Sequence, residues 1–121
     1  MYNKVFLIGR LVRDPELRVT STGIALCRFT VAVDRYRNKE TNESVTDFIR
    51  IVSWRRLAEI CGEYLKKGKL VSVDGRLQLD QYEKDGQMRE SVELVADNLQ
   101  MLDRGQPVSD QYAEGQSVDQ V

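Results

Sequence analysis

The chain has 121 residues, with 18 Lys and Arg residues against 19 Asp and Glu residues, which is enough for one domain with a real core. Histidine is absent and the two cysteines lack paired ligand spacing, so the composition argues against a histidine proton shuttle and a zinc site. No apolar run approaches the roughly 18 residues that span a membrane, and the N-terminus lacks the parts of a signal peptide, so we expect a cytoplasmic protein. We also expect no cofactor.

The charge is unevenly distributed along the chain. From Gly105 onward there are three acids and no Lys or Arg, so residues 1–104 hold 18 basic against 16 acidic residues and carry a net charge of +2. Residues 105–121 are rich in Gly, Gln, Ser and Asp and have too few apolar residues to pack. We therefore predict one domain over residues 1–104, followed by a short disordered C-terminal tail.

Three strands are predicted in the first half of the chain. Residues 3–12 carry apolar side chains of both parities, which is typical of a central strand or of a subunit interface. A turn at Ser21-Thr22-Gly23 separates this strand from a second one over residues 24–34. A polar loop over residues 37–45 then leads into a third strand over residues 46–54.

The second half begins with a change of period. Apolar residues recur at helical spacing over residues 57–65, and Gly68 is placed to end the helix. A fourth strand follows over residues 70–82, then a turn at Lys84-Asp85-Gly86, and a last strand over residues 88–102 that we expect to be broken near Asp97 and Asn98. Five strands with a helix between the third and fourth predict an all-β, five-stranded barrel, the oligonucleotide/oligosaccharide-binding (OB) fold.

The third strand carries an unusual outer face. Ile49 and Ile51 share a core face, whereas Phe48, Arg50, Val52 and Trp54 share the other, so two aromatics flank a guanidinium. Such a face suits the stacking of nucleic-acid bases. Any one aromatic could be a half-buried packing residue, but as a set four are predicted to stack bases: Tyr36, Phe48, Trp54 and Tyr82.

Cations accompany these aromatics, and seven are candidate contacts to phosphate: Lys4, Arg10, Arg28, Lys39, Arg50, Arg56 and Arg76. Asp80 and Glu83 flank Tyr82 and would repel phosphate there. The sequence contains neither a phosphate-binding G-K-[ST] motif nor a G-x-S-x-G nucleophile motif. We therefore predict a binding protein and not an enzyme.

At residues 3–102 the chain resembles the bacterial-type single-stranded DNA-binding protein family, in stretches that include Ile8-Gly9-Arg10-Leu11, Asp14-Pro15-Glu16, Tyr64-Leu65-Lys66-Lys67-Gly68 and Val73-Asp74-Gly75. The resemblance implies an OB fold, a homotetramer, and binding of single-stranded DNA in replication, recombination and repair, in the bacterial cytoplasm at the nucleoid. It places the family's stacking residues on the four aromatics above, and basic contacts on Lys4, Lys39, Arg50 and Arg56.

The C-terminus departs from the family pattern. Many members end in an acidic tip with a terminal Pro-Phe that recruits other proteins, whereas this sequence ends Ser-Val-Asp-Gln-Val. Recruitment is absent, or uses other residues, or the sequence stops short of the natural end, so tail-mediated recruitment is not carried over. Two alternative functions remain open: an OB-fold interaction subunit of a primosome-type assembly, and a binder of single-stranded RNA.

Overall fold

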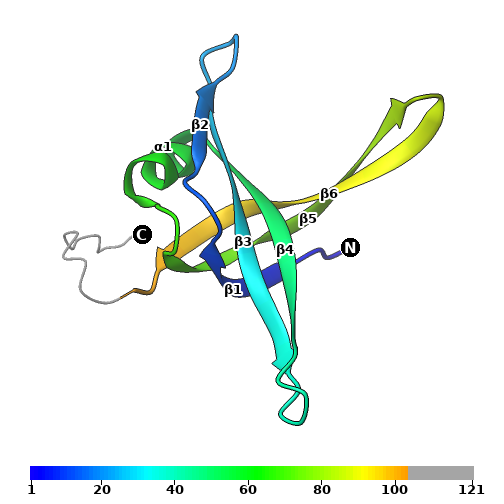
Figure 1. Ribbon diagram of the computed structural model, residues 1–121. Helices are drawn as coiled ribbons and strands as arrows, with labels where there is room; N and C mark the ends of the chain where they lie inside the picture. Colours follow the sequence, from blue (N-terminus) through cyan, green and yellow to red (C-terminus); the bar gives the residue numbers. More distant parts are fainter. Residues whose placement is uncertain (104–121) are drawn as a thin grey trace.

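The computed structural model describes residues 1–103, which form six strands and one helix (Figure 1). The elements in chain order are β1 (Val5–Leu11), β2 (Glu16–Val19), β3 (Ala25–Arg37), β4 (Ser44–Trp54), α1 (Arg55–Tyr64), β5 (Leu70–Lys84) and β6 (Gln87–Met101). The predicted tail over residues 105–121, and the end of the domain at residue 104, lie outside the described residues.

Five of the strands close into a barrel. The sheet runs β1-β5-β6-β4-β3, and pairing of Arg10 with Ala32 joins β3 back to β1. All of these pairings are antiparallel except β4 with β6. The closed ring and its single helix confirm the predicted OB barrel, with α1 between its third and fourth strands.

Strand β2 is the one strand that the sequence did not predict. It pairs with β3 alone, from Glu16 opposite Arg28 to Val19 opposite Ala25. Its four residues are all exposed, so no buried face marks it in the sequence. Contact with the helix helps to hold it, because Leu17 lies so close to Gly62 that a methyl group there would press on its side chain.

The barrel interior contains the apolar residues of the inward-facing sides. Helix α1 covers it with Ala58 and Cys61, and Leu65 follows directly after the helix. The buried set is Leu11, Cys27, Phe29, Val31, Ile51, Ala58, Cys61, Leu65, Val71, Val73, Leu94 and Ala96. Val52 belongs to a separate cluster with Leu26 and Val95 and is only 1% exposed. The expectation that Val52 lies on an open outer face was therefore wrong. Its neighbour in the parallel β4–β6 pairing is Val95, and this pairing buries it.

The pairing of strands β5 and β6 is irregular at Gly75. A Cβ atom at this position would clash with the backbone carbonyl oxygen of Val95, so only glycine fits. Asp74 pairs with Asn98 and Gly75 pairs with Ala96, which leaves Asp97 as an extra residue in β6. The predicted break in the last strand is thus a β-bulge, and β6 is continuous.

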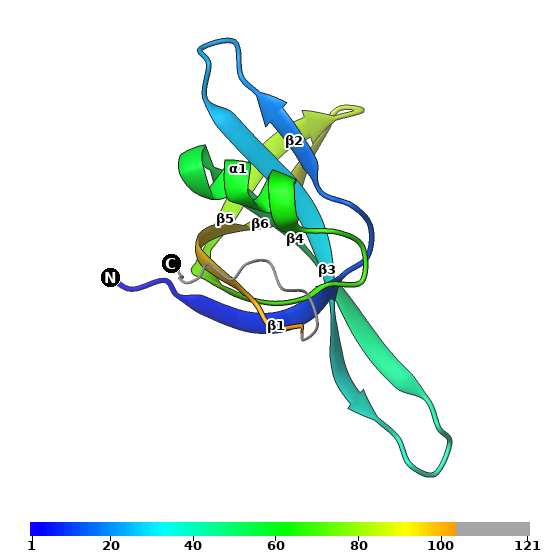
Figure 2. The same ribbon diagram turned by 90° about the vertical axis from the view of Figure 1, so that its left-hand side faces the viewer.

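Two long hairpins project beyond the barrel as arms, one made by β3 and β4 and the other by β5 and β6 (Figures 1 and 2). The second arm turns at Asp85 and Gly86, which both have positive φ, at 55° and 76°. Two such residues in a two-residue hairpin loop are typical of a type I′ turn, as Asp-Gly predicts. The arms place part of β3 to β6 outside the core.

Candidate nucleic-acid interface

The outer side of β3 and β4 forms an exposed surface that we call the β3–β4 face, defined by Arg28, Phe48, Arg50 and Trp54. The register sets Phe48 opposite Ala32, Arg50 opposite Thr30 and Trp54 opposite Leu26. The small partner of Phe48 leaves its ring open, and Phe48 and Trp54 are 66% and 40% exposed. The structure thus places two of the predicted stacking aromatics on one face of β4, with Arg50 and the buried Val52 between them.

The other two predicted aromatics lie on the arms. Tyr36 stands next to the end of β3, and Tyr82 lies two residues before the end of β5. Both are exposed, and the two arms project from the barrel in different directions (Figure 1). The four aromatics are therefore spread over the barrel wall and both arms, and a strand that met all four would have to pass around the molecule.

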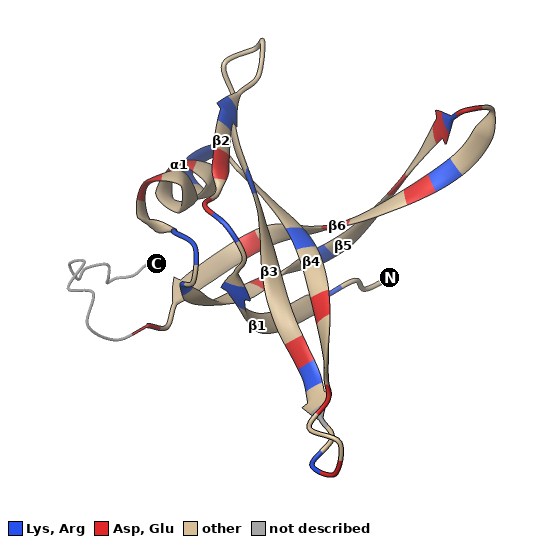
Figure 3. Ribbon diagram, viewed as in Figure 1, with Lys and Arg blue, Asp and Glu red and all other residues tan. Residues whose placement is uncertain are grey.

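Most of the predicted phosphate contacts already have a carboxylate partner. Figure 3 shows that acidic and basic residues alternate over the barrel and the arms. Five of the seven cations are ion-paired: Lys4 with Asp74, Arg10 with Asp103, Arg28 with Glu93, Arg56 with Glu59 and Arg76 with Asp97. Within residues 1–103, only Arg50 and Lys39 of the seven have no ion pair. Exposed pairs are weak, so phosphate can displace the acids, but Arg50 needs no exchange of partners.

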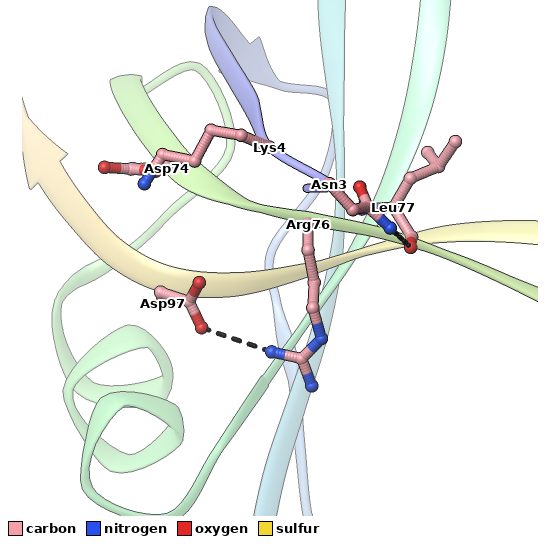
Figure 4. Close-up of polar contacts among 6 residues, drawn as sticks. All are labelled: Asn3, Lys4, Asp74, Arg76, Leu77 and Asp97. Carbon is pink, nitrogen blue, oxygen red and sulfur yellow. Dashed lines mark hydrogen bonds and ion pairs between the residues drawn. The ribbon is translucent and has the colours of Figure 1, made fainter. Parts of the chain in front are cut away.

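Two of the cations, Lys4 and Arg10, are placed away from the β3–β4 face. They share the exposed side of β1 with Phe6 and Ile8, which are 64% and 47% exposed. The amide of Asn3 extends the β1–β5 ladder by donating to the carbonyl of Leu77 at 2.7 Å and accepting from its N–H at 3.0 Å (Figure 4). Direct phosphate contact by Lys4 and Arg10 would therefore belong to a second surface.

Near the irregular pairing at Gly75, Lys4 is ion-paired with Asp74 and Arg76 with Asp97 (Figure 4). Lys4 Nζ lies 2.5 Å from Asp74 Oδ1, a buried carboxylate oxygen. The close carboxylate raises the pKa of Lys4 above its ordinary value. Arg76 Nη1 donates to Asp97 Oδ1 at 3.4 Å, and Asp97 is the bulge residue of β6.

Two grooves border the β3–β4 face. The larger, of about 360 Å³, is lined by residues of β4, β5 and β6 that include Phe48, Arg50, Leu77, Glu90 and Val92. The smaller, of about 150 Å³, is lined by residues that include Arg13, Arg28, Arg50 and Glu93. Sequence reasoning missed Arg13, Glu90 and Glu93. No local signal marks Glu93, because its partner Arg28 lies 65 residues away in the chain.

The described part of the chain offers little for other kinds of site. Among residues 1–103, no group of three or more His, Cys, Asp or Glu side chains is arranged to hold a metal ion. The one helix over these residues, α1, lacks the length and apolar character of a membrane span.

Comparisons with known proteins agree on one family. The model of the Single-strand binding protein family matches residues 2–102. The single-stranded DNA-binding protein of Halalkalibacterium halodurans is 44% identical over 120 residues, which cover 98% of this chain and 70% of that protein. Single-stranded DNA-binding protein A of Bacillus subtilis is 47% identical over 104 residues, which cover 85% of this chain and 60% of that protein.

A solved structure supports the same assignment at the level of the fold. A Plasmodium falciparum SSB in complex with ssDNA superposes with a TM-score of 0.77 at 28% identity, over 85% of this chain and 96% of that chain. The chain thus spans only part of its bacterial relatives but nearly all of that solved chain. On its sequence over residues 2–102 and on its barrel, this chain belongs to the single-strand binding protein family.

Proposed function

We propose that the chain binds single-stranded DNA, largely without sequence preference, by stacking bases on exposed aromatics and contacting phosphates with nearby cations. The observation that carries this proposal is the guanidinium of Arg50, which has no ion pair within residues 1–103 and is exposed on the barrel wall between Phe48 and Trp54. Base stacking on an aromatic ring is worth about 1–3 kcal/mol per base and tolerates any sequence. Membership of the family, and the ssDNA bound to the structural neighbour, support the same function.

Binding of this kind makes and breaks no covalent bond, so the proposal includes no catalytic step. Its role is to protect single strands in DNA replication, recombination and repair, in the bacterial cytoplasm at the nucleoid. Residues 1–104 carry a net charge of only +2, and most candidate cations are already ion-paired. Stacking therefore contributes more than charge, and the salt dependence of binding should be shallow.

The proposal includes assembly into a homotetramer. Phe6 and Ile8 are exposed next to each other on one side of β1, where the sequence predicted a central strand or a subunit interface. Their side is open within the single chain, so the interface explanation accounts for their apolar character. Packing of this side against a second copy would bury both residues and bring Lys4 and Arg10 to the subunit boundary.

The test uses Trp54, the single tryptophan of the chain, as a fluorescent reporter. Titration with oligo-thymidine should quench its emission, and Phe48→Ala should weaken binding about thirtyfold, the middle of the range for one stacked base. Phe6→Ala is the matched control, because Phe6 is as exposed as Phe48 but lies on β1.

A short oligomer of about eight nucleotides, within the span of one such fold, keeps the readout to a single barrel. With it, Phe6→Ala should bind almost as the wild type does, while its solution mass falls. Unchanged emission together with no mobility shift would refute the proposal. If Phe48→Ala instead dissociated the oligomer, the face would be a protein-docking surface, and tighter binding of a matched RNA would favour the RNA alternative.

A further inference from the structure

The smaller groove, of about 150 Å³, lies on the β3–β4 face. Arg28 and Thr30 of β3 line it, and Thr30 lies opposite Arg50 of β4 in the register. Residues two apart on a strand point to the same side of the sheet, so Arg50 shares its side with Phe48 and Trp54. The groove is therefore on the same side of the sheet as the two aromatics, at a position along β4 between them.

Arg13 reaches this groove from the connection between β1 and β2. On one side of it, the N–H of Val12 donates to the carbonyl of Thr30 at 3.0 Å, which holds the connection against β3. On the other side, the Asp14 carboxylate accepts from the N–H of Lys67 at 2.9 Å. Both neighbours of Arg13 are therefore held in place, and Arg13 itself is exposed among the residues that line the groove.

The acids of the groove are occupied, whereas two of its three arginines have no ion pair. Each of the three acids accepts from another group: Asp14 from the N–H of Lys67, Glu16 from Arg18 and Glu93 from Arg28. Within residues 1–103, Arg13 and Arg50 form no ion pair. Two guanidiniums of one groove can therefore bind an anion without displacing a carboxylate.

The size and chemistry of the groove suit a phosphate group. Its volume of about 150 Å³ is well below the roughly 300 Å³ at which sites for whole small-molecule ligands begin, so the groove suits a small group. A guanidinium presents a planar fork of donors that matches two oxygens of a phosphate. A strand whose bases stack on both Phe48 and Trp54 carries phosphates between those bases, at the part of β4 where Arg50 lies.

We propose that Arg13 is a further phosphate contact, and that with Arg50 it holds the backbone of the strand between bases stacked on Phe48 and Trp54. The inference rests on the proposed function, and it adds to the site a residue from outside the β3–β4 hairpin. Phosphate contacts carry no sequence information. Arg13 should therefore strengthen the binding of every sequence to the same extent.

The experiment titrates oligo-thymidine of about eight nucleotides against the full chain by Trp54 quenching, at several salt concentrations. Arg13→Gln should lower the affinity about fivefold at low salt, the upper end for an exposed ion pair. It should also make the slope of log affinity against log salt shallower by about 0.7, the value for one phosphate contact on a single strand. Arg13→Lys keeps the positive charge and should keep the slope.

Lys69→Gln is the control, because it removes the same charge from the connection between α1 and β5, outside both grooves. Its affinity and its salt slope should stay close to those of the wild type. Equal losses in the two Gln variants, or wild-type binding by Arg13→Gln, would overturn the inference and leave the proposed function intact. Failure of the wild-type chain to bind the oligomer would overturn the proposed function, and the inference with it.

Discussion

Arg28 on β3 donates from Nε to Oε2 of Glu93 on β6 at 3.0 Å, and the pair spans β4, which lies between these strands in the sheet. The side chain of Glu93 is only 19% exposed, so solvent screens its charge less than that of a surface acid. Arg28 and Arg50 line the same small groove. Glu93 thus holds the guanidinium of Arg28 near Arg50 and at the same time neutralises the charge of Arg28.

Glu93→Gln should therefore strengthen the binding of oligo-thymidine. The substitution removes the negative charge but keeps an oxygen that can accept from Arg28. We expect a two- to fivefold higher affinity at low salt, as for loss of a weak competing ion pair. The slope of log affinity against log salt should become steeper by about 0.7, the value for one more phosphate contact on a single strand. Quenching of Trp54 at several salt concentrations measures both quantities.

Glu59→Gln is the control for this prediction. It frees Arg56 from a more exposed pair on α1, so its effect on affinity and on the salt slope should be smaller. Weaker binding by Glu93→Gln would contradict the prediction, and would show that the carboxylate positions Arg28 for the strand and does not compete with it.

Gly75→Ala should destabilise the fold far more than Gly62→Ala. At Gly75 the added methyl group meets the rigid carbonyl of Val95, and such overpacking costs roughly 3 kcal/mol. At Gly62 it meets the Leu17 side chain, with its Cδ2 at 2.9 Å, which can move aside. Helix propensity there favours alanine by up to about 1 kcal/mol. Urea denaturation should place the free energy of unfolding of Gly62→Ala within about 1 kcal/mol of the wild type. Equal losses of stability in the two variants would refute this account of the contact between Gly75 and Val95.

Local periodicity predicted much of this fold because the barrel strands have one buried and one exposed face. The alternation from Phe48 to Trp54 and the Asp85-Gly86 turn could both be predicted, because each is determined by residues that are close in the sequence. Val52 did not, because its burial depends on Val95, which is far away in the chain. The exposed strand β2 likewise has no buried face, and only its pairing with β3 defines it.

The candidate site shows the same limit. Side-chain parity identified Phe48, Arg50 and Trp54 as residues of one face, and the register bears this out. Parity does not reveal where a strand leaves the barrel, so it could not place Tyr36 and Tyr82 on separate arms. It also could not identify Glu93 as the partner of Arg28, since that contact depends on the order of strands in the sheet.

The two thiols should be inert in the folded protein. Burial raises the pKa of Cys27 to about 11 and that of Cys61 to about 12, and the thiolate is the reactive form. At about pH 8 a thiol reagent should therefore label the unfolded chain quickly and the native chain only as fast as it opens. Labelling with and without urea measures this difference. Rapid reaction of both thiols in native buffer would show that the core beneath α1 is accessible.

The β3–β4 arm contains a paired acid whose titration can be predicted. Arg35 donates from Nε and Nη2 to the two oxygens of Asp47, each at 3.0 Å. These hydrogen bonds lower the pKa of Asp47 below its ordinary value. A lowered pKa means that the contact stabilises the fold above the ordinary carboxyl pKa of about 3.9, and that this contribution is lost as pH falls through the lower folded value.

Arg35→Gln should therefore return the pKa of Asp47 towards its ordinary value, as followed by the NMR shift of its carboxyl carbon. The control is Arg18→Gln, which removes the same charge from the Arg18–Glu16 pair on β2 and should leave the Asp47 titration in place. If Asp47 titrated alike in the wild type and in Arg35→Gln, the bidentate contact would not persist in solution. The base of the arm that carries Tyr36 would then lack this link between its two strands.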